Sequence, residues 1–241
     1  QKDDPDSYDK GYLHCDLLIV GAGPAGLTAA LTAGRANAEV IIADEDFTFG
    51  GRLNAETIAI GAFSGADWAA QITAELAAMP NVRVMPRTTV IGAFDHGIYG
   101  AVERVSDHLA APAAGKPRQI LWRLYTKRTV LCSGALDRPI VFQNNDRPGI
   151  MLASAMRAFA NRWAVTPAQQ VAVFTNHDDG HRTAVDLLAK GVGVVAVIDS
   201  RENAPKIADC ELIAGAQVIN SRGRLGLKSI VVETADGLQR T

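Results

Sequence analysis

The stretch that decides the fold is "CDLLIVGAGPAGLTAALTAGRANAEVIIAD", residues 15–44. It begins with a continuous apolar run at 15–20, of the kind that forms a strand buried on both faces of a parallel sheet. An Ala-rich segment that favours a helix follows, and a second apolar run occupies 38–44. Strand, helix and strand within about thirty residues predict a βαβ unit.

The turn between the first strand and the helix is the glycine pattern GxGxxG, residues 21–26. Gly21 permits the tight turn, Gly23 lets the backbone approach a pyrophosphate, and Gly26 lets the helix pack closely on the strand. The helix N-terminus adds unpaired N–H groups and a partial positive charge. We therefore expect a bound dinucleotide here, in preference to a turn that is packed for structure alone.

An acid ends the second strand, as such sites require. Asp44 lies eighteen residues after Gly26, and Glu45 follows it. A carboxylate at this place holds the ribose hydroxyls and disfavours a 2′-phosphate, so NADP is not expected. The next segment is Gly50-Gly51-Arg52-Leu53. Arg52 either pairs with the pyrophosphate, whose geometry suits a guanidinium, or is a surface arginine.

The remaining sequence predicts an α/β, Rossmann-like FAD/NAD(P)-binding fold with a parallel sheet, an antiparallel β-ribbon insertion and a partial second nucleotide-type domain. The expected organisation is an N-terminal linker at 1–14, a dinucleotide-binding domain at 15–148 with its ribbon at 88–127, and a truncated, degenerate domain at 149–241. Within these we expect helices at 67–79 and 146–165 and a strand at 128–135.

The bulk properties exclude several classes of protein. The chain has 241 residues and a formal net charge of −2 without a long basic run, so neither nucleic acid nor an anionic membrane is expected as a partner. No apolar stretch is long enough to cross a bilayer. Three scattered cysteines without a CxxC pair predict neither zinc nor a dithiol centre and suit the reducing cytoplasm. The polar start lacks Met and is not a signal peptide, so we expect an internal piece of a longer polypeptide.

A second strand, turn and helix occur at "VFTNHDDGHRTA", residues 173–184. Asp178 and Asp179 replace the glycines there; they are expected to cap the helix and to repel a pyrophosphate. His177 and His181 are four residues apart, the spacing of a metal pair on one helix face, but His177 is expected in the turn. We therefore predict one dinucleotide site and no metal site.

Three segments carry a closer resemblance: "AVERVSDHL" (101–109), "NNDRPGIMLASA" (144–155) and "VFTNHD" (173–178). With the glycine turn, they resemble the alpha subunit of heterotetrameric sarcosine oxidases, over nearly the whole chain. The glycine turn is shared by many flavoproteins, whereas the three segments are far more specific.

The resemblance implies that the assembled enzyme oxidatively demethylates sarcosine with oxygen and tetrahydrofolate. It implies beta, gamma and delta subunits as partners, with FAD and covalent FMN held by the beta subunit and its interface with alpha. The alpha subunit is expected to hold NAD. The chain shows no acid–base or nucleophile constellation, so we expect no catalytic residues in it and no activity from it alone.

The resemblance also places the nucleotide contacts. The residues expected at the cofactor are Gly21, Gly23, Pro24, Ala25, Gly26, Asp44, Glu45, Gly51, Arg52, Leu53, Thr89, Val90, Ser133 and Gly134. Backbone at Thr89 and Val90 would touch the adenine. Ser133 and Gly134 would close over the cofactor, as in flavoproteins with two dinucleotide-binding domains. Cys132-Ser133 departs from the commoner Ala-Thr, and Cys132 is expected to be a small buried apolar residue.

Three alternatives stay open. The chain is a stand-alone oxidoreductase with FAD in the glycine turn, or an alpha subunit of a related amine, opine or proline dehydrogenase, or a scaffold in which a bound nucleotide only stabilises the fold. A yellow solution would favour the first alternative.

Overall fold

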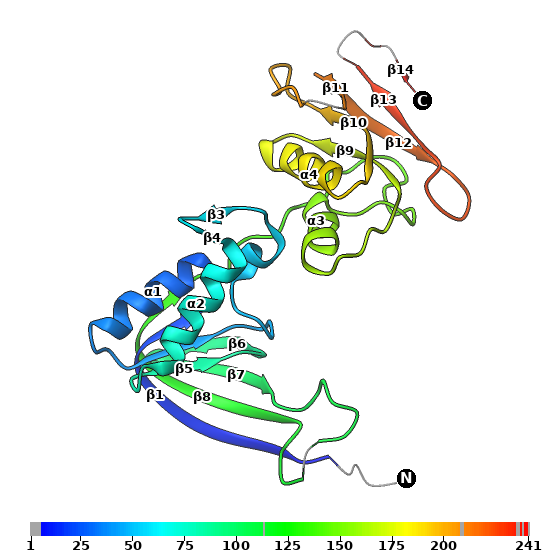
Figure 1. Cartoon of the computed structure of the whole chain (residues 1–241). Helices are drawn as coiled ribbons and strands as arrows, with labels where there is room; N and C mark the ends of the chain where they lie inside the picture. Colours follow the sequence, from blue (N-terminus) through cyan, green and yellow to red (C-terminus); the bar gives the residue numbers. More distant parts are fainter. Residues whose placement is uncertain (1–5, 113, 208–209, 235–236, 238, 241) are drawn as a thin grey trace, which may run out of the picture. The chain divides into compact units, whose positions relative to one another are not determined.

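The chain forms two compact units in the computed structural model, which describes residues 6–112, 114–207, 210–234, 237 and 239–240 (Figure 1). The first unit contains Gln1–Asn54 and Ile58–Ala135, and the second contains Ala55–Thr57 and Leu136–Thr241. This division lies thirteen residues before the boundary that we expected at 148, and it places a short internal segment in the second unit. Residues 1–5 of the expected linker lie outside the described residues.

The first unit is built on a six-stranded sheet in the order β5-β2-β1-β8-β7-β6. The strands are β1 (Tyr8–Val20), β2 (Val40–Ala43), β5 (Val82–Met85), β6 (Thr88–Phe94), β7 (Ile98–Arg104) and β8 (Gln119–Leu131). The first four in the sheet order run parallel, and β8, β7 and β6 pair antiparallel. The prediction of a mainly parallel sheet with an antiparallel ribbon is confirmed.

Two sequence expectations differ from this sheet. The strand expected at 128–135 is the end of β8, which serves both as the last ribbon strand and as a parallel strand beside β1. Residues 8–14, expected in a linker, belong to β1 and pair with β8 from Tyr8 onward. The long β1–β8 pair supplies backbone partners that a linker would lack.

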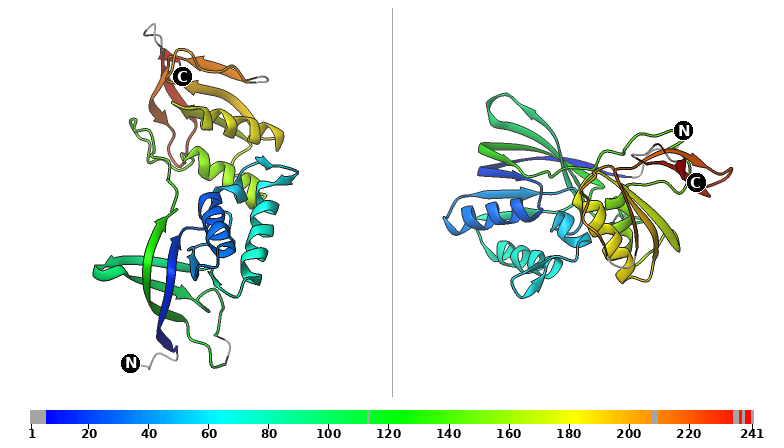
Figure 2. Two further views of the ribbon diagram at one scale, coloured as in Figure 1. Left: turned by 90° about the vertical axis from the view of Figure 1, so that its left-hand side faces the viewer. Right: turned by 90° about the horizontal axis from the view of Figure 1, so that it is seen from above.

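Helices α1 (Pro24–Arg35) and α2 (Gly65–Ala78) cover one face of this sheet (Figure 2). Leu27 from α1, Ile42 from β2 and Leu76 from α2 are fully buried together in the core between them. Each such side chain stabilises the fold by about 1.5–3 kcal/mol. The unit also contains β3 (Ala59–Ile60), β4 (Phe63–Ser64), η2 (Asp95–Gly97) and all but the last residue of η1 (Gly51–Ala55).

The second unit has a parallel three-stranded sheet in the order β11-β10-β9. Its elements are α3 (Ala153–Arg162), β9 (Gln170–Thr175), α4 (Asp178–Ala189), β10 (Gly193–Asp199), β11 (Glu211–Ala214), β12 (Gln217–Arg222), β13 (Ser229–Glu233) and β14 (Gln239–Arg240). Val197 of β10 packs with α3 and α4, whereas Ile198 packs with β12 and β13. The sheet therefore carries helices on one face and an antiparallel sheet on the other.

The helix predicted at 146–165 is shorter than expected, because it begins at Ala153. The preceding residues are bonded to β12 instead. Gln143 pairs with Asn220, and Arg147 donates to Ser221 Oγ at 3.1 Å and to the Gly223 carbonyl. Within the described part of the chain, no helix has both the length and the hydropathy needed to cross a membrane.

Candidate dinucleotide site

Two of the three glycines in the first turn are required by packing. Gly21 has a φ of 99°, a region that glycine adopts without strain, and a Cβ there would overlap the Cys132 carbonyl. A Cβ on Gly26 would overlap the Gly21 carbonyl oxygen. These glycines therefore allow α1 and the end of β8 to lie close to the turn.

Gly23 is different, because it has an ordinary extended conformation and a Cβ there would meet nothing within 4 Å. It is the N-cap of α1, and no side chain caps the helix. The turn at Gly50 and Gly51 lies beside it: Gly50 N donates to the Ala22 carbonyl at 2.8 Å, and a Cβ on Gly51 would be 3.0 Å from Gly23 Cα. Open backbone at a helix N-terminus is a cradle suited to a phosphate.

Asp44, the residue after β2, is fixed beside this turn. Its Oδ2 accepts a hydrogen bond from Ala22 N at 2.6 Å, and its Oδ1 accepts one from Asp46 N at 2.8 Å. Thr88 N donates to the Asp44 carbonyl at 2.7 Å. Because a carboxylate can accept about four hydrogen bonds, the side chain retains capacity for two hydroxyl groups.

The structure brings most of the other predicted residues to the same end of the sheet. Thr89 and Val90 follow Thr88 on β6, and Ser133 and Gly134 are exposed just beyond β8. Glu45 is exposed next to Asp44, and Pro24, Ala25 and Arg52 are exposed at the starts of α1 and η1. Leu53 is also in η1, and its side chain is only 5% exposed and packs in the core, so only its backbone is available to a cofactor.

Cys132 also lies at this turn. Its N–H donates to the Val20 carbonyl at 2.7 Å, and its side chain packs against the core that contains Leu27. Burial raises the pKa of the Cys132 thiol. The thiol therefore stays protonated at neutral pH and has the environment of a small apolar side chain.

The corresponding turn in the second unit has a different chemistry. His177 is the N-cap of α4, and its Nδ1 accepts from Asp179 N at 3.2 Å. The prediction that the two acids cap the helix was therefore wrong, because His177 itself supplies the acceptor. Asp178 pairs with Arg201 at 2.8 Å, and Asp179 pairs with Arg157 at 3.2 Å.

Asp199 follows the pattern of Asp44, since it ends the second strand of a βαβ unit, but its oxygens are already bonded. Arg201 Nη2 lies 2.8 Å from Oδ2, His181 Nε2 lies 2.6 Å from the same oxygen, and Arg201 N donates to Oδ1 at 2.9 Å. Burial alone would raise the pKa of Asp199, but the hydrogen bonds from Arg201 and His181 outweigh burial and lower the pKa to about 2.

Comparison with known proteins identifies relatives of this chain. A family model described as FAD dependent oxidoreductase matches residues 16–79. Sarcosine oxidase subunit alpha of Rhizobium meliloti (strain 1021) is 46% identical over 231 residues, which are 95% of this chain and 23% of that protein. The protein of the same name from Corynebacterium sp. (strain P-1) is 42% identical over 96% of this chain.

The chain is homologous to a segment of sarcosine oxidase alpha subunits. The resemblance predicted from sequence is thus confirmed. The chain spans about a quarter of the length of these alpha subunits, 23% in each case.

A solved structure with the same fold is L-proline dehydrogenase from P. horikoshii, with a TM-score of 0.69 and 22% identity. The alignment covers 98% of this chain and 41% of that one. The alignment includes residues of both units, so the proline dehydrogenase has counterparts of the second nucleotide-type fold in addition to the first.

The three segments that we singled out for their resemblance to sarcosine oxidase alpha subunits, 101–109, 144–155 and 173–178, can be located in the structure. In the segment 144–155, Asn144 and Arg147 bond to β12, and residues 173–178 form the end of β9 and the turn to α4. The segment 101–109 contains Arg104, whose guanidinium donates to the Glu45 carbonyl. Sequence reasoning missed this contact, because no local pattern relates residues 45 and 104.

Proposed function

We propose that the first unit binds NAD, and that the chain is the dinucleotide-binding portion of the alpha subunit of a sarcosine oxidase. One observation carries the proposal: the open backbone at Gly23, at an uncapped helix N-terminus, lies beside a carboxylate that is already anchored to the same turn. A Cβ would fill this cradle, so the residues present fit a pyrophosphate.

Each residue of the site has a simple binding role in this proposal. The free N–H groups at the start of α1 would donate to the pyrophosphate, and Arg52 would add a positive charge. Asp44 would accept from the ribose hydroxyls. Backbone at Thr89 and Val90 would contact the adenine, and Ser133 and Gly134 would cover the cofactor. A bound nicotinamide supplies hydride exchange, whereas the chain's own residues bind and orient.

FAD is the second candidate for the same site. The family model that matches residues 16–79 is that of FAD dependent oxidoreductases, and the adenosine half of FAD needs the same cradle and the same acid. In this alternative the chain binds its own flavin, either as a stand-alone oxidoreductase or as an alpha subunit of a related amine, opine or proline dehydrogenase.

The assembled enzyme is part of the proposal. The relatives in Rhizobium and Corynebacterium are named as subunits, which supports an assembly with further chains. We propose beta, gamma and delta partners, oxidative demethylation of sarcosine at flavins held through the beta subunit, and a cytoplasmic location. The chain alone is expected to be inactive.

The identity of the bound nucleotide tests the proposal. The purified chain is denatured, and the released small molecules are separated and weighed by mass spectrometry. NAD at near one molecule per chain is the expected result. Release of FAD without NAD would contradict the NAD assignment and support the flavoprotein alternative.

A pair of glycine variants tests the site itself. Gly23→Ala adds a methyl group to open space and should change the free energy of unfolding by less than about 1 kcal/mol. It should lower NAD affinity by at least about tenfold, because the methyl group occupies the cradle. Gly26→Ala should instead destabilise the fold, since its Cβ overlaps the Gly21 carbonyl. Calorimetric titration and urea unfolding separate the two effects. Unchanged affinity in a folded Gly23→Ala chain would contradict the proposed site.

A further inference from the structure

Two arginines hold the loop that follows Asp44. We call residues Glu45–Phe47 the 45–47 loop. The Arg104 guanidinium donates to the Glu45 carbonyl, and Arg87 N donates to the Asp46 carbonyl at 2.8 Å. The Arg87 guanidinium lies over the Phe47 ring, 5.2 Å from its centroid.

The two arginines are themselves joined. Arg104 N donates to the Arg87 carbonyl at 2.9 Å, so the end of β7 is bonded to the turn between β5 and β6. Thr88, the next residue, donates to the Asp44 carbonyl. The backbone of Asp44 and Glu45 is thus held by Thr88 of β6 and Arg104 of β7, two strands of one sheet.

We propose that Arg104 is a positioning residue that sets the preference of this site for an unmodified ribose over a 2′-phosphate. This inference rests on the proposed NAD site. By holding the Glu45 carbonyl, Arg104 fixes the backbone that carries two consecutive acidic residues at the ribose end, where a 2′-phosphate would bring a further negative charge.

The Arg104 guanidinium could in principle bind a phosphate, but in this structure it donates to a backbone carbonyl. Arginine pairs readily with phosphate, and an arginine near the ribose is a usual device for binding NADP. Here the Arg104 guanidinium donates to the Glu45 carbonyl of the 45–47 loop. A role in positioning and a role in phosphate binding therefore predict opposite effects when Arg104 is removed.

The test is a titration of the full chain with NAD and with NADP. Arg104→Met removes the donor and the charge and keeps the apolar stem; Arg104→Lys keeps a charged donor. The control is Arg123→Met on β8, an exposed arginine that lies over Tyr12. In Arg104→Met the ratio of NAD to NADP affinity should fall about fivefold, mainly through weaker NAD binding. Arg104→Lys should retain most of the ratio, and Arg123→Met should leave it unchanged.

Each other outcome overturns the inference. A selective loss of NADP affinity in Arg104→Met would show that Arg104 binds phosphate. An equal loss of both affinities would leave their ratio unchanged and show a merely structural role, and two unchanged affinities would show no role. A folded wild-type chain that binds no NAD would overturn the proposed function together with the inference, which distinguishes that failure from the others.

Discussion

Two aspartates at equivalent positions in the two units have different hydrogen-bond partners. Asp44 directly follows β2, and Asp199 is the last residue of β10; each of these strands is the second strand of a βαβ unit. Asp44 accepts from two backbone N–H groups and keeps capacity for a ligand, whereas Asp199 is bonded to Arg201 and His181 and is fully buried. The same carboxylate therefore serves a candidate binding site in one unit and an internal ion pair in the other.

The lowered pKa of Asp199 predicts a pH dependence of stability. The folded-state pKa of about 2 lies below the ordinary value of 3.8, so the ion pair stabilises the fold above that value and loses its effect as the pH falls toward 2. The advantage of the wild type over Asp199→Asn should shrink by about 1 kcal/mol between pH 5 and pH 3. Urea unfolding of both proteins at a series of pH values measures this difference in the free energy of unfolding. A difference that stays constant across this range would contradict the assigned pKa.

Local residue patterns predicted the core of the candidate site, because glycine spacing and a strand-terminal acid are encoded within a short stretch. The roles of Leu53 and His177 were not predictable in the same way. Leu53 is in the core because its side chain packs with residues of α1 and α2, and His177 caps α4 because its imidazole happens to reach Asp179 N. Both depend on side-chain direction, which spacing does not specify.

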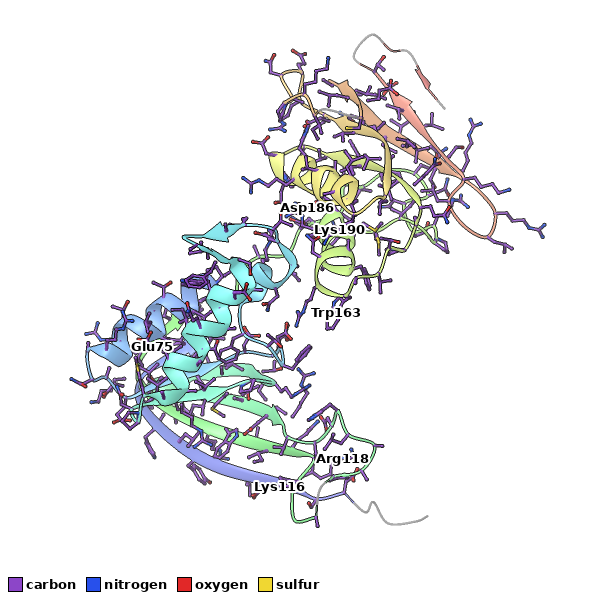
Figure 3. All side chains as sticks on the ribbon, in the orientation of Figure 1. Glu75, Lys116, Arg118, Trp163, Asp186 and Lys190 are labelled. Atoms are coloured by element: carbon purple, nitrogen blue, oxygen red, sulfur yellow. The ribbon has the colours of Figure 1, made fainter. Side chains whose placement is uncertain are left out.

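At the scale of elements, a buried arginine on α3 joins three segments of the second unit. The Arg157 side chain is 3% exposed and lies near three carboxylates: Asp179 at 3.2 Å, Asp186 at 3.4 Å and Glu56 at 3.7 Å. Asn161, one turn further on, donates to the Ala55 carbonyl and to Asp186, which lies on the face of α4 toward α3 (Figure 3). The segment Ala55–Thr57 is thus bonded to both helices.

Removal of this arginine should be costly. Arg157→Met leaves the buried Asp186 carboxylate without its cation, and loss of one member of a buried pair costs about 3–5 kcal/mol. Arg182→Met is the matched control, because Arg182 is on α4, 66% exposed, and 3.9 Å from the same Asp179. The control should cost less than about 1 kcal/mol. Urea unfolding followed by a signal from the second unit compares them, and similar small losses in both variants would contradict the role of Arg157.

These contacts explain why element boundaries were only partly predictable. Hydrophobic periodicity located α2 and the strands well, because each buries one face against a neighbour. The start of α3 and the assignment of Ala55–Thr57 to the second unit were missed, since both depend on bonds between residues about 75 to 130 positions apart in sequence. No local pattern contains such information.

At the scale of the whole molecule, the chain repeats one nucleotide-type fold with one open and one closed turn. The first turn has glycines, an uncapped helix and an acid with free capacity. The second has a histidine cap, two acids at the helix start and an acid neutralised by Arg201. A nucleotide is therefore expected to stabilise the first unit and to leave the second unaffected.

Amide hydrogen exchange can measure this difference in one experiment. A ligand that binds only the folded state stabilises it by about 2.7 kcal/mol at a hundredfold excess over its Kd. With NAD at that excess, amides of β1, β2 and α1 that exchange through unfolding of the first unit should exchange about a hundredfold more slowly. Amides of β9 and α4 should keep their rates, because the two acids at the start of α4 repel a pyrophosphate and His177 already accepts from Asp179 N. Gly23→Ala supplies the control, since a tenfold loss of NAD affinity should reduce the slowing at the same NAD concentration from about a hundredfold to about tenfold. Slowing of the β9 and α4 amides that persists in Gly23→Ala would show that the second turn also binds NAD, and the assignment of a single site to the first unit would then be wrong.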